Sequence, residues 1–275
     1  MSIYTIKPIK GKGDEDKRKP LGYELFPDKH CSIYISGPTR SGKTSLINHI
    51  TTHCIDDRCT VYIFAATVNL PSSGYTAMIP ELEKRGITVH AYCHFIDDDG
   101  NNILADILKT AAKKVETKEK EKETERKVIG SCIQNGRLMV QYDKSDVIEE
   151  KKKKAKSKFS CPKRLFIFDD LSSDMRNGSI YQLLSKQRHY RAKTLVSTQS
   201  IKDLVPRAIN QLNYVILYPG FPMEKIIEFF KNGAIPNLTL DEFEELYKYA
   251  TSEKYNFLYI NRFEGEFRKN FDEEI

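Results

Sequence analysis

The chain has 275 residues, of which 40% are hydrophobic and 30% are charged. This length suits one large α/β domain, or a core with an insertion, and excludes two complete motor domains. The formal net charge is +6, and much of that excess lies in local lysine-rich runs. The charge therefore suits a polyanionic partner but does not identify it.

Two features of the sequence indicate the cellular compartment in which the protein works. The six cysteines are scattered without a C-x-x-C pair, and the sequence opens without a charged and then apolar leader, so we expect reduced thiols in a cytosol-like compartment. Polar and turn-forming residues interrupt the uncharged stretch over residues 59–80, among them Asn69, Pro71 and Gly74. We therefore expect no transmembrane helix.

The first 24 residues offer little that a core could bury, and we predict that they form a mobile N-terminal arm. The core is expected to begin near Leu25. An apolar run over residues 31–36 follows, which we interpret as the first buried strand.

Residues 37–44 read Gly-Pro-Thr-Arg-Ser-Gly-Lys-Thr, which matches the phosphate-binding pattern G-x-x-x-x-G-K-[ST]. The glycines let successive backbone N–H groups turn toward a triphosphate, and the helix that follows adds the positive end of its dipole. We expect Lys43 to reach the β- and γ-phosphates and Thr44 to hold Mg²⁺. The predicted nucleotide contacts are Gly37, Pro38, Thr39, Arg40, Ser41, Gly42, Lys43, Thr44 and Ser45.

The next segments alternate between buried strands and charged stretches. Residues 59–66 and 87–92 have the apolar, β-branched composition of strands in a parallel sheet. Residues 113–127 contain twelve charged side chains spaced for i,i+4 pairs, which predicts a solvated helix that leaves the core. The lysine-rich block from Lys151 to Lys158 predicts a flexible loop, so we interpret residues 111–160 as a charged insertion.

The core resumes at residues 164–168, an apolar strand that ends in Asp169 and Asp170. A helix over 179–186, a strand over 193–199, a helix around 201–212 and a strand over 213–218 follow. This alternation predicts right-handed crossovers and a mainly parallel sheet flanked by helices. Two further helices are predicted near residues 223–230 and 240–247, the second capped by Thr239, before a C-terminal hairpin over 255–271.

The acidic pair would share one crevice with the phosphate loop, because ligands bind outside the carboxyl ends of parallel strands. We assign Asp169 to Mg²⁺, held through its water shell, and Asp170 to polarising the water that attacks the γ-phosphate. The alternative is a solvated Asp-Asp turn that starts a helix. Gln199, also at a strand end, could contact the γ-phosphate and the attacking water, although such a residue is often only part of a turn.

Arg188 lies between the acidic pair and Gln199. Its guanidinium could stabilise transition-state charge on the nucleotide of a neighbouring subunit, and we favour it over Arg191 for this role. A DNA-phosphate contact or a surface salt bridge is an equally good interpretation.

Together, Gly-Pro-Thr-Arg-Ser-Gly-Lys-Thr, Phe-Ile-Phe-Asp-Asp, Arg-His and Ser-Thr-Gln-Ser resemble the FtsK–HerA superfamily of ATPases, and within it the poxvirus-type DNA-packaging ATPases of large DNA viruses. The resemblance spans about residues 25–275 apart from the insertion. It implies an assembled ring, an arginine supplied by the adjacent subunit, and double-stranded DNA as the cargo. The wider superfamily often has Glu where this chain has Asp170, so Asp169 is the firmer assignment.

We thus expect an ASCE-type P-loop NTPase domain over residues 25–275 that hydrolyses ATP with Mg²⁺ and packages viral DNA. The resemblance further implies a homo-oligomeric ring, capsid or portal components as partners, and a location at viral assembly sites in the host cytoplasm or in the virion. Two alternatives stay open: a helicase or recombination ATPase, and a nucleotide-binding structural protein.

Overall fold

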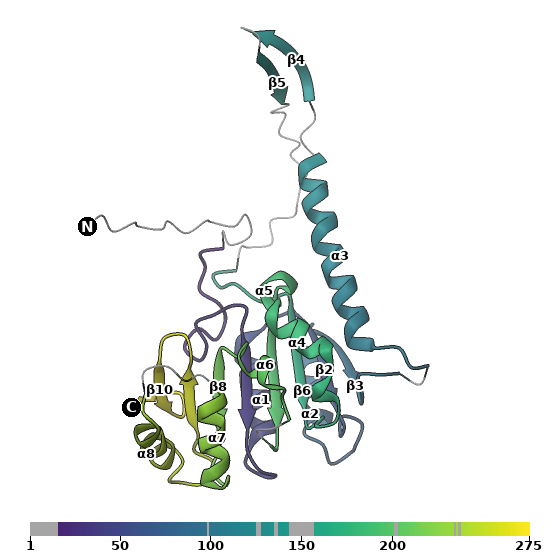
Figure 1. Cartoon of the computed structure of the whole chain (residues 1–275). Helices are drawn as coiled ribbons and strands as arrows, with labels where there is room; N and C mark the ends of the chain where they lie inside the picture. Colours follow the sequence, from purple (N-terminus) through teal and green to yellow (C-terminus); the bar gives the residue numbers. More distant parts are fainter. Residues whose placement is uncertain are drawn as a thin grey trace, which may run out of the picture.

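The computed structural model describes residues 16–97, 99–124, 128–134, 137–142, 157–200, 203–233, 235 and 238–275. Within these ranges a nine-stranded sheet has the order β11-β10-β9-β8-β1-β7-β6-β2-β3 (Figure 1). The strands are β1 (Ser32–Ser36), β2 (Thr60–Ala65), β3 (Thr88–Tyr92), β6 (Arg164–Asp169), β7 (Ala192–Thr198), β8 (Tyr214–Leu217), β9 (Leu258–Asn261), β10 (Glu266–Lys269) and β11 (Glu273–Glu274).

The sheet is parallel from β3 to β8, which confirms the predicted α/β class with a mainly parallel sheet. The central strands read as continuous apolar runs because helices cover both of their faces. β3 differs from the predicted buried strand: it is the edge strand, and Thr88, His90 and Ala91 are exposed. β9 and β10 continue the sheet antiparallel beside β8, and the turn between them contains Gly265. The predicted C-terminal hairpin is therefore confirmed.

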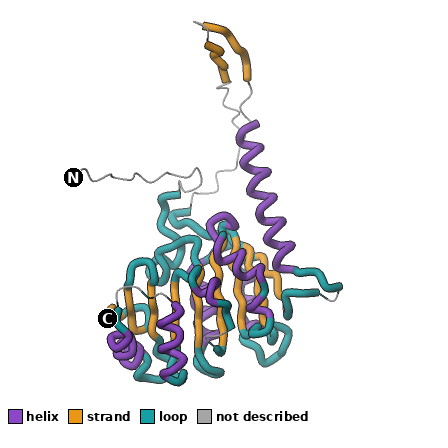
Figure 2. Tube along the Cα trace, viewed as in Figure 1, coloured by secondary structure: helices purple, strands orange, loops and turns teal. Residues whose placement is uncertain are grey.

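Helices cover the two faces of the sheet in two layers, which Figure 2 shows in purple. They are α1 (Lys43–Cys54), α2 (Tyr75–Lys84), α3 (Ile103–Thr124), α4 (Gly178–Ser185), α5 (Gln187–Tyr190), α6 (Pro206–Ile209), α7 (Met223–Gly233) and α8 (Leu240–Ala250). The sheet has a hydrophobic core on each of its two faces, and successive side chains of one strand point into opposite cores. Ile33 and Ile35 pack with α1 and α2, whereas Tyr34 packs with α4, α6, α7 and α8.

One predicted helix is much shorter than expected. The helix predicted around residues 201–212 is reduced to the four residues of α6, where Pro206 occupies the first turn and has no N–H to donate. Residues 201 and 202 lie outside the described part of the chain.

The insertion begins within a helix. α3 starts at Ile103, and its first turns bury Leu104, Leu108 and Ala111 in the core, so the predicted boundary at 111 falls inside one continuous helix. Beyond it, β4 (Val128–Gln134) and β5 (Arg137–Tyr142) form an antiparallel pair inside the predicted insertion, where no strand was predicted. Most of the Lys151–Lys158 block lies outside the described residues.

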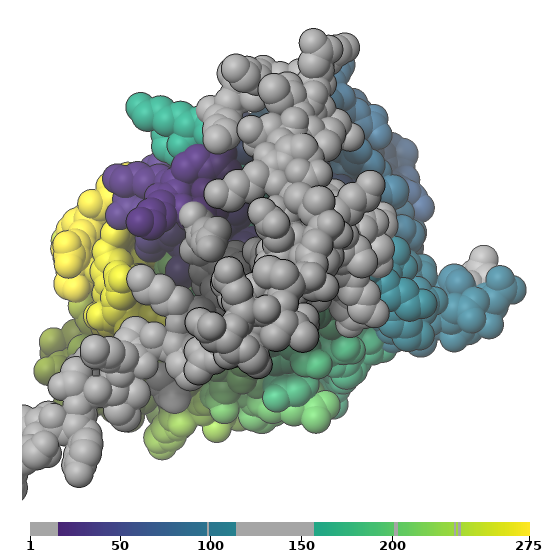
Figure 3. All heavy atoms as spheres, turned by 90° about the horizontal axis from the view of Figure 1, so that it is seen from above, coloured from purple at the N-terminus to yellow at the C-terminus, as the bar shows by residue number. Residues whose placement is uncertain are grey.

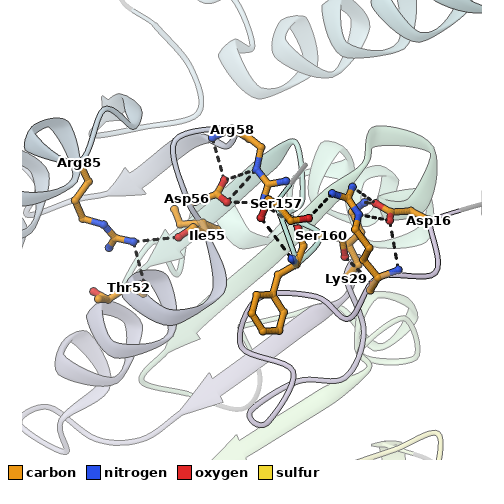
Figure 4. Close-up of polar contacts among 11 residues, drawn as sticks. Asp16, Lys29, Thr52, Ile55, Asp56, Arg58, Arg85, Ser157 and Ser160 are labelled. Atoms are coloured by element: carbon orange, nitrogen blue, oxygen red, sulfur yellow. Dashed lines mark hydrogen bonds and ion pairs between the residues drawn. The ribbon is translucent and has the colours of Figure 1, made fainter. Parts of the chain in front are cut away.

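The N-terminal segment differs from the predicted mobile arm over residues 16–24. Pro20 forms a β-bridge with Ser160, and the Leu21 N–H donates to the Ser160 carbonyl at 2.9 Å. Arg18 donates to the Ser157 carbonyl at 3.0 Å. Figure 4 shows the polar contacts around this junction, with Ser157 and Ser160 close to Asp16. The end of the insertion and the start of the core thus hold each other in place. Residues 1–15 lie outside the description.

The two ends of the described chain also pack together. Phe26 makes an edge-to-face contact with Phe271, with 5.8 Å between the ring centroids, and a second aromatic contact with Tyr259. Figure 3, seen from above Figure 1, shows the yellow C-terminal residues beside the purple N-terminal ones. Among the described helices, none is both long and apolar enough to span a bilayer.

Candidate nucleotide-binding and hydrolysis site

The predicted phosphate loop runs from the end of β1 to the first turn of α1, as expected. Gly42 takes a φ of +100° just before the helix, a conformation that suits glycine. Gly37 is needed for a different reason: an added Cβ would lie 2.6 Å from the Ser41 Oγ and 2.8 Å from the Tyr218 Cβ. The loop is therefore built around two positions where a side chain is strained or does not fit.

The Lys43 side chain is buried within the loop. Its Nζ donates to the carbonyl oxygens of Gly37 at 2.8 Å and Pro38 at 2.9 Å. Burial lowers the pKa of this ammonium, which the nearby carboxylates of Asp169 and Asp170 partly oppose. The loop thus surrounds the Lys43 ammonium. When a triphosphate binds, its oxygens would accept the hydrogen bonds that the two loop carbonyls accept here.

Asp169 ends β6, next to the phosphate loop. Its Oδ2 accepts a hydrogen bond from the Tyr75 hydroxyl at 2.8 Å and another from the Thr44 Oγ1 at 3.4 Å. Asp169 is only 6% exposed, and this burial raises the pKa of its carboxyl above the ordinary value of 3.8. Tyr75 begins α2 and is itself fully buried; it was not among the site residues predicted from the sequence.

Asp170 and Gln199 meet at the adjacent strand ends. The Gln199 Nε2 donates to the Asp170 Oδ2, and its Oε1 accepts from the Thr39 Oγ1 at 2.9 Å. Asp170 has a φ of +58°, so its backbone turns sharply where the strand stops. A continuous polar chain therefore runs from the phosphate loop through Gln199 to Asp170.

These oxygen donors suit Mg²⁺, which prefers carboxylate and hydroxyl ligands together with phosphate oxygens. The Thr44 hydroxyl and the Asp169 carboxylate face each other across the end of the loop, as the predicted metal site requires. No group of three or more His, Cys, Asp or Glu side chains in the described ranges is placed to hold a metal.

A cavity of about 730 Å³ opens beside the loop. Its volume is in the range of small-molecule sites in proteins. Besides the loop itself and the start of α1, two tyrosines from the last quarter of the chain line it, Tyr218 and Tyr255. The Tyr218 carbonyl accepts a hydrogen bond from the Tyr247 hydroxyl at 2.9 Å, so α8 supports this wall.

Arg188 does not join this site. It lies in α5, before β7 begins, whereas the phosphate loop lies at the carboxyl end of the sheet; α5 is at the upper end of the sheet in Figure 1. There Arg188 lines a second cavity of about 480 Å³ with Asp28 and His189. Within one chain Arg188 therefore cannot reach the nucleotide, and a finger role would require a neighbouring copy. Arg191, the alternative, caps the same helix.

Comparison with known proteins places this arrangement among characterised folds. No protein-family model matches the chain, and no curated protein sequence matches it. Solved structures do. The genome-packaging NTPase B204 from Sulfolobus turreted icosahedral virus 2, in complex with AMP, superposes with a TM-score of 0.54 at 14% identity, over 88% of this chain and 98% of that one.

The chain has the fold of a viral packaging NTPase. The DNA-packaging ATPase B204 from Sulfolobus turreted icosahedral virus agrees, with a TM-score of 0.51 at 16% identity over 87% of this chain and 96% of that one. The pCW3 conjugation coupling protein TcpA matches all of this chain and 69% of its own, with a TM-score of 0.52 at 13% identity. The predicted resemblance is thus confirmed at the level of the fold.

Proposed function

We propose that this protein is an Mg²⁺-dependent ATPase that drives double-stranded viral DNA into a capsid. The observation that carries the proposal is the convergence of Lys43, Thr44, Asp169, Asp170 and Gln199 at the carboxyl ends of three adjacent strands. A protein that only binds a nucleotide has no need for a second carboxylate held beside the phosphate loop.

Each side chain has a distinct role in this proposal. Lys43 leaves the loop carbonyls for the β- and γ-phosphate oxygens, while Thr44 and Asp169 hold the metal ion. Bound Mg²⁺ would neutralise negative charge on the phosphoryl group that is transferred. Asp170 orients the attacking water and accepts its proton. Because Gln199 already links Thr39 to Asp170, a γ-phosphate that displaces this contact changes how Asp170 is held.

The proposal that the cargo is DNA rests on the fold and on the net charge of the chain. Both B204 structures are described as packaging enzymes, and the positive net charge of this chain suits a polyanion. We further propose that the protein acts as a homo-oligomeric ring, with capsid or portal components as partners, at viral assembly sites in the host cytoplasm or in the virion.

The test is the rate of phosphate release from ATP, with and without double-stranded DNA, across a salt series. We expect DNA to stimulate the rate and the stimulation to decline steeply as salt rises, because phosphate contacts release counterions. Lys43→Ala should abolish turnover. Turnover that DNA leaves unchanged at low salt would argue for a nucleotide-binding structural protein, and strand displacement without a capsid would argue for a helicase.

A further inference from the structure

Tyr255 has an unusual position for a large aromatic side chain. It is 55% exposed, and it lines the cavity beside the phosphate loop, although more than two hundred residues separate it from the loop in sequence. A Cβ added to Gly42 would lie 3.6 Å from the Tyr255 Cδ1. The ring therefore lies in van der Waals reach of the loop's second glycine.

The backbone at Tyr255 is strained. Its φ is +73°, in the left-handed region where Gly and Asn are at ease and a bulky residue is an outlier. Such strain persists only where the surrounding structure enforces it, and it is concentrated at functional sites. If stability of the fold alone decided the residue at this position, Gly or Asn would be favoured. The presence of a tyrosine therefore indicates a functional role for its ring.

The segment around Tyr255 is firmly held. The Asn270 side chain accepts from the Phe257 N–H at 3.1 Å and donates to the Asn256 side chain at 3.1 Å. Phe257 is buried against Tyr218, with 5.4 Å between their ring centroids. The exposed ring is thus presented from a rigid support, as a stacking platform needs to be.

The chemistry of the cavity wall indicates what the ring would contact. Apart from residues 40–45, which include the phosphate-loop part of the lining, the described residues that line the cavity are Leu46, Tyr218 and Tyr255. None of these three carries an amide or carboxylate that could read the edge of a base. Lys254 places its Nζ 4.8 Å from the centroid of the Tyr255 ring, so a cation accompanies the platform.

We propose that Tyr255 is the platform on which the base of the bound nucleotide stacks, and that this subsite favours purine nucleoside triphosphates without distinguishing adenine from guanine. The inference rests on the proposed function, because it assumes a triphosphate in the loop. Stacking depends on overlap of ring faces, so a purine gains more than a pyrimidine and the two purines gain similarly.

The test compares nucleotides with inorganic tripolyphosphate, which has the phosphates and lacks the base. Calorimetric titrations use the full chain with Mg²⁺ and the variants Tyr255→Asn and Tyr255→Phe. Asn tolerates the left-handed backbone and removes the ring without adding strain, whereas Phe keeps the ring. The matched control is Tyr23→Asn, which removes another exposed tyrosine that has a lysine over its ring, Lys19 at 4.4 Å, but does not line the cavity.

We expect Tyr255→Asn to weaken ATP and GTP binding by roughly ten- to a hundredfold and to leave tripolyphosphate binding unchanged. Tyr255→Phe and Tyr23→Asn should bind ATP as the parent chain does, and CTP should bind the parent chain more weakly than either purine. Unchanged ATP affinity in Tyr255→Asn, or an equal loss for tripolyphosphate, would overturn the stacking role. A parent chain that binds ATP but never hydrolyses it would instead refute the proposed ATPase.

Discussion

Asp169 and Asp170 are adjacent in sequence, yet their carboxyl groups have different surroundings. Asp169 is buried and accepts from Tyr75 and Thr44, whereas Asp170 is partly exposed and accepts from Gln199. The strand ends between them, and the backbone takes a positive φ at Asp170. The two side chains can therefore serve different steps of one reaction.

The first prediction concerns Asp170→Asn. Asparagine tolerates a positive φ, so we expect an intact fold and unimpaired ATP binding. Loss of the group that accepts the proton should lower the hydrolysis rate by about a hundredfold or more. Calorimetry measures binding, and phosphate release measures turnover. Parent-like turnover would remove Asp170 from the role of base.

The second prediction concerns Asp169→Asn and pH. Burial raises the pKa of Asp169 in the fold, so holding it ionised costs stability above about pH 4, where the unfolded chain is already ionised. The neutral variant should therefore unfold at a higher temperature than the parent at pH 7. Its advantage should disappear as the pH falls toward the ordinary value of 3.8. We expect Mg²⁺ affinity to fall roughly ten- to a hundredfold.

Thermal melts across pH, with and without Mg²⁺, check this prediction. A variant that is less stable than the parent at pH 7 would show that the Tyr75 and Lys43 interactions outweigh the cost of burying the carboxylate.

Residues at strand ends could be predicted from the sequence, and residues brought in from other segments could not. Asp169 and Gln199 follow apolar runs, and adjacent parallel strands place such ends side by side; Asp169 pairs in register with Ser197, two residues before Gln199. Tyr75 follows a polar stretch with no pattern that marks a hydrogen bond to Asp169. Tyr255 is equally unmarked, because its contact with the loop depends on how the C-terminal segment packs.

At the scale of elements, α8 is linked to the nucleotide site through Tyr247 and Tyr218. The helix begins with a capping box, in which the Glu242 N–H donates to the Thr239 Oγ1 at 3.3 Å and the Thr239 N–H donates to the Glu242 carboxylate at 2.7 Å. Two backbone donors at the helix start are satisfied in this way. The predicted cap is confirmed.

The third prediction is that Thr239→Ala lowers the free energy of unfolding by about 1 kcal/mol. Urea denaturation measures the change. The control is Lys248→Ala in the same helix, which removes an exposed i,i+4 pair with Glu244 and should cost only about 0.3 kcal/mol. Equal effects of the two substitutions would show that the capping box contributes no more to stability than an exposed ion pair does.

Elements with a strong repeat were predicted well, whereas short or context-dependent ones were not. The buried strands and the amphipathic helices α7 and α8 have clear apolar patterns. The strands β4 and β5 were not predicted, because their short apolar runs lie inside a strongly charged region that was interpreted as one insertion. α6 is short because its proline stops a helix from extending backward.

At the scale of the whole molecule, the phosphate loop and Arg188 lie at opposite ends of the sheet. If Arg188 acts as a finger, the chain supplies it to a neighbour and receives one in return. Each nucleotide site would then be complete only between two copies.

The fourth prediction follows from this division. Lys43→Ala and Arg188→Ala should each be inactive alone, and a mixture should regain partial ATPase activity, because an intact loop on one subunit can face an intact arginine on another. Repeating the mixture with Arg191→Ala tests the alternative residue. A mixture as inactive as its components would exclude a finger role for the arginine tested.

The strand order has a consequence for how the protein is made. β1 ends at Ser36, but its two neighbours in the sheet begin at Ala192 and Tyr214. While a ribosome is still translating the first two-thirds of the message, the strand that carries the phosphate loop has no partner on either side. The nascent chain therefore acquires its nucleotide site as a late event of synthesis, and a prematurely terminated product has the full loop sequence without the scaffold to shape it.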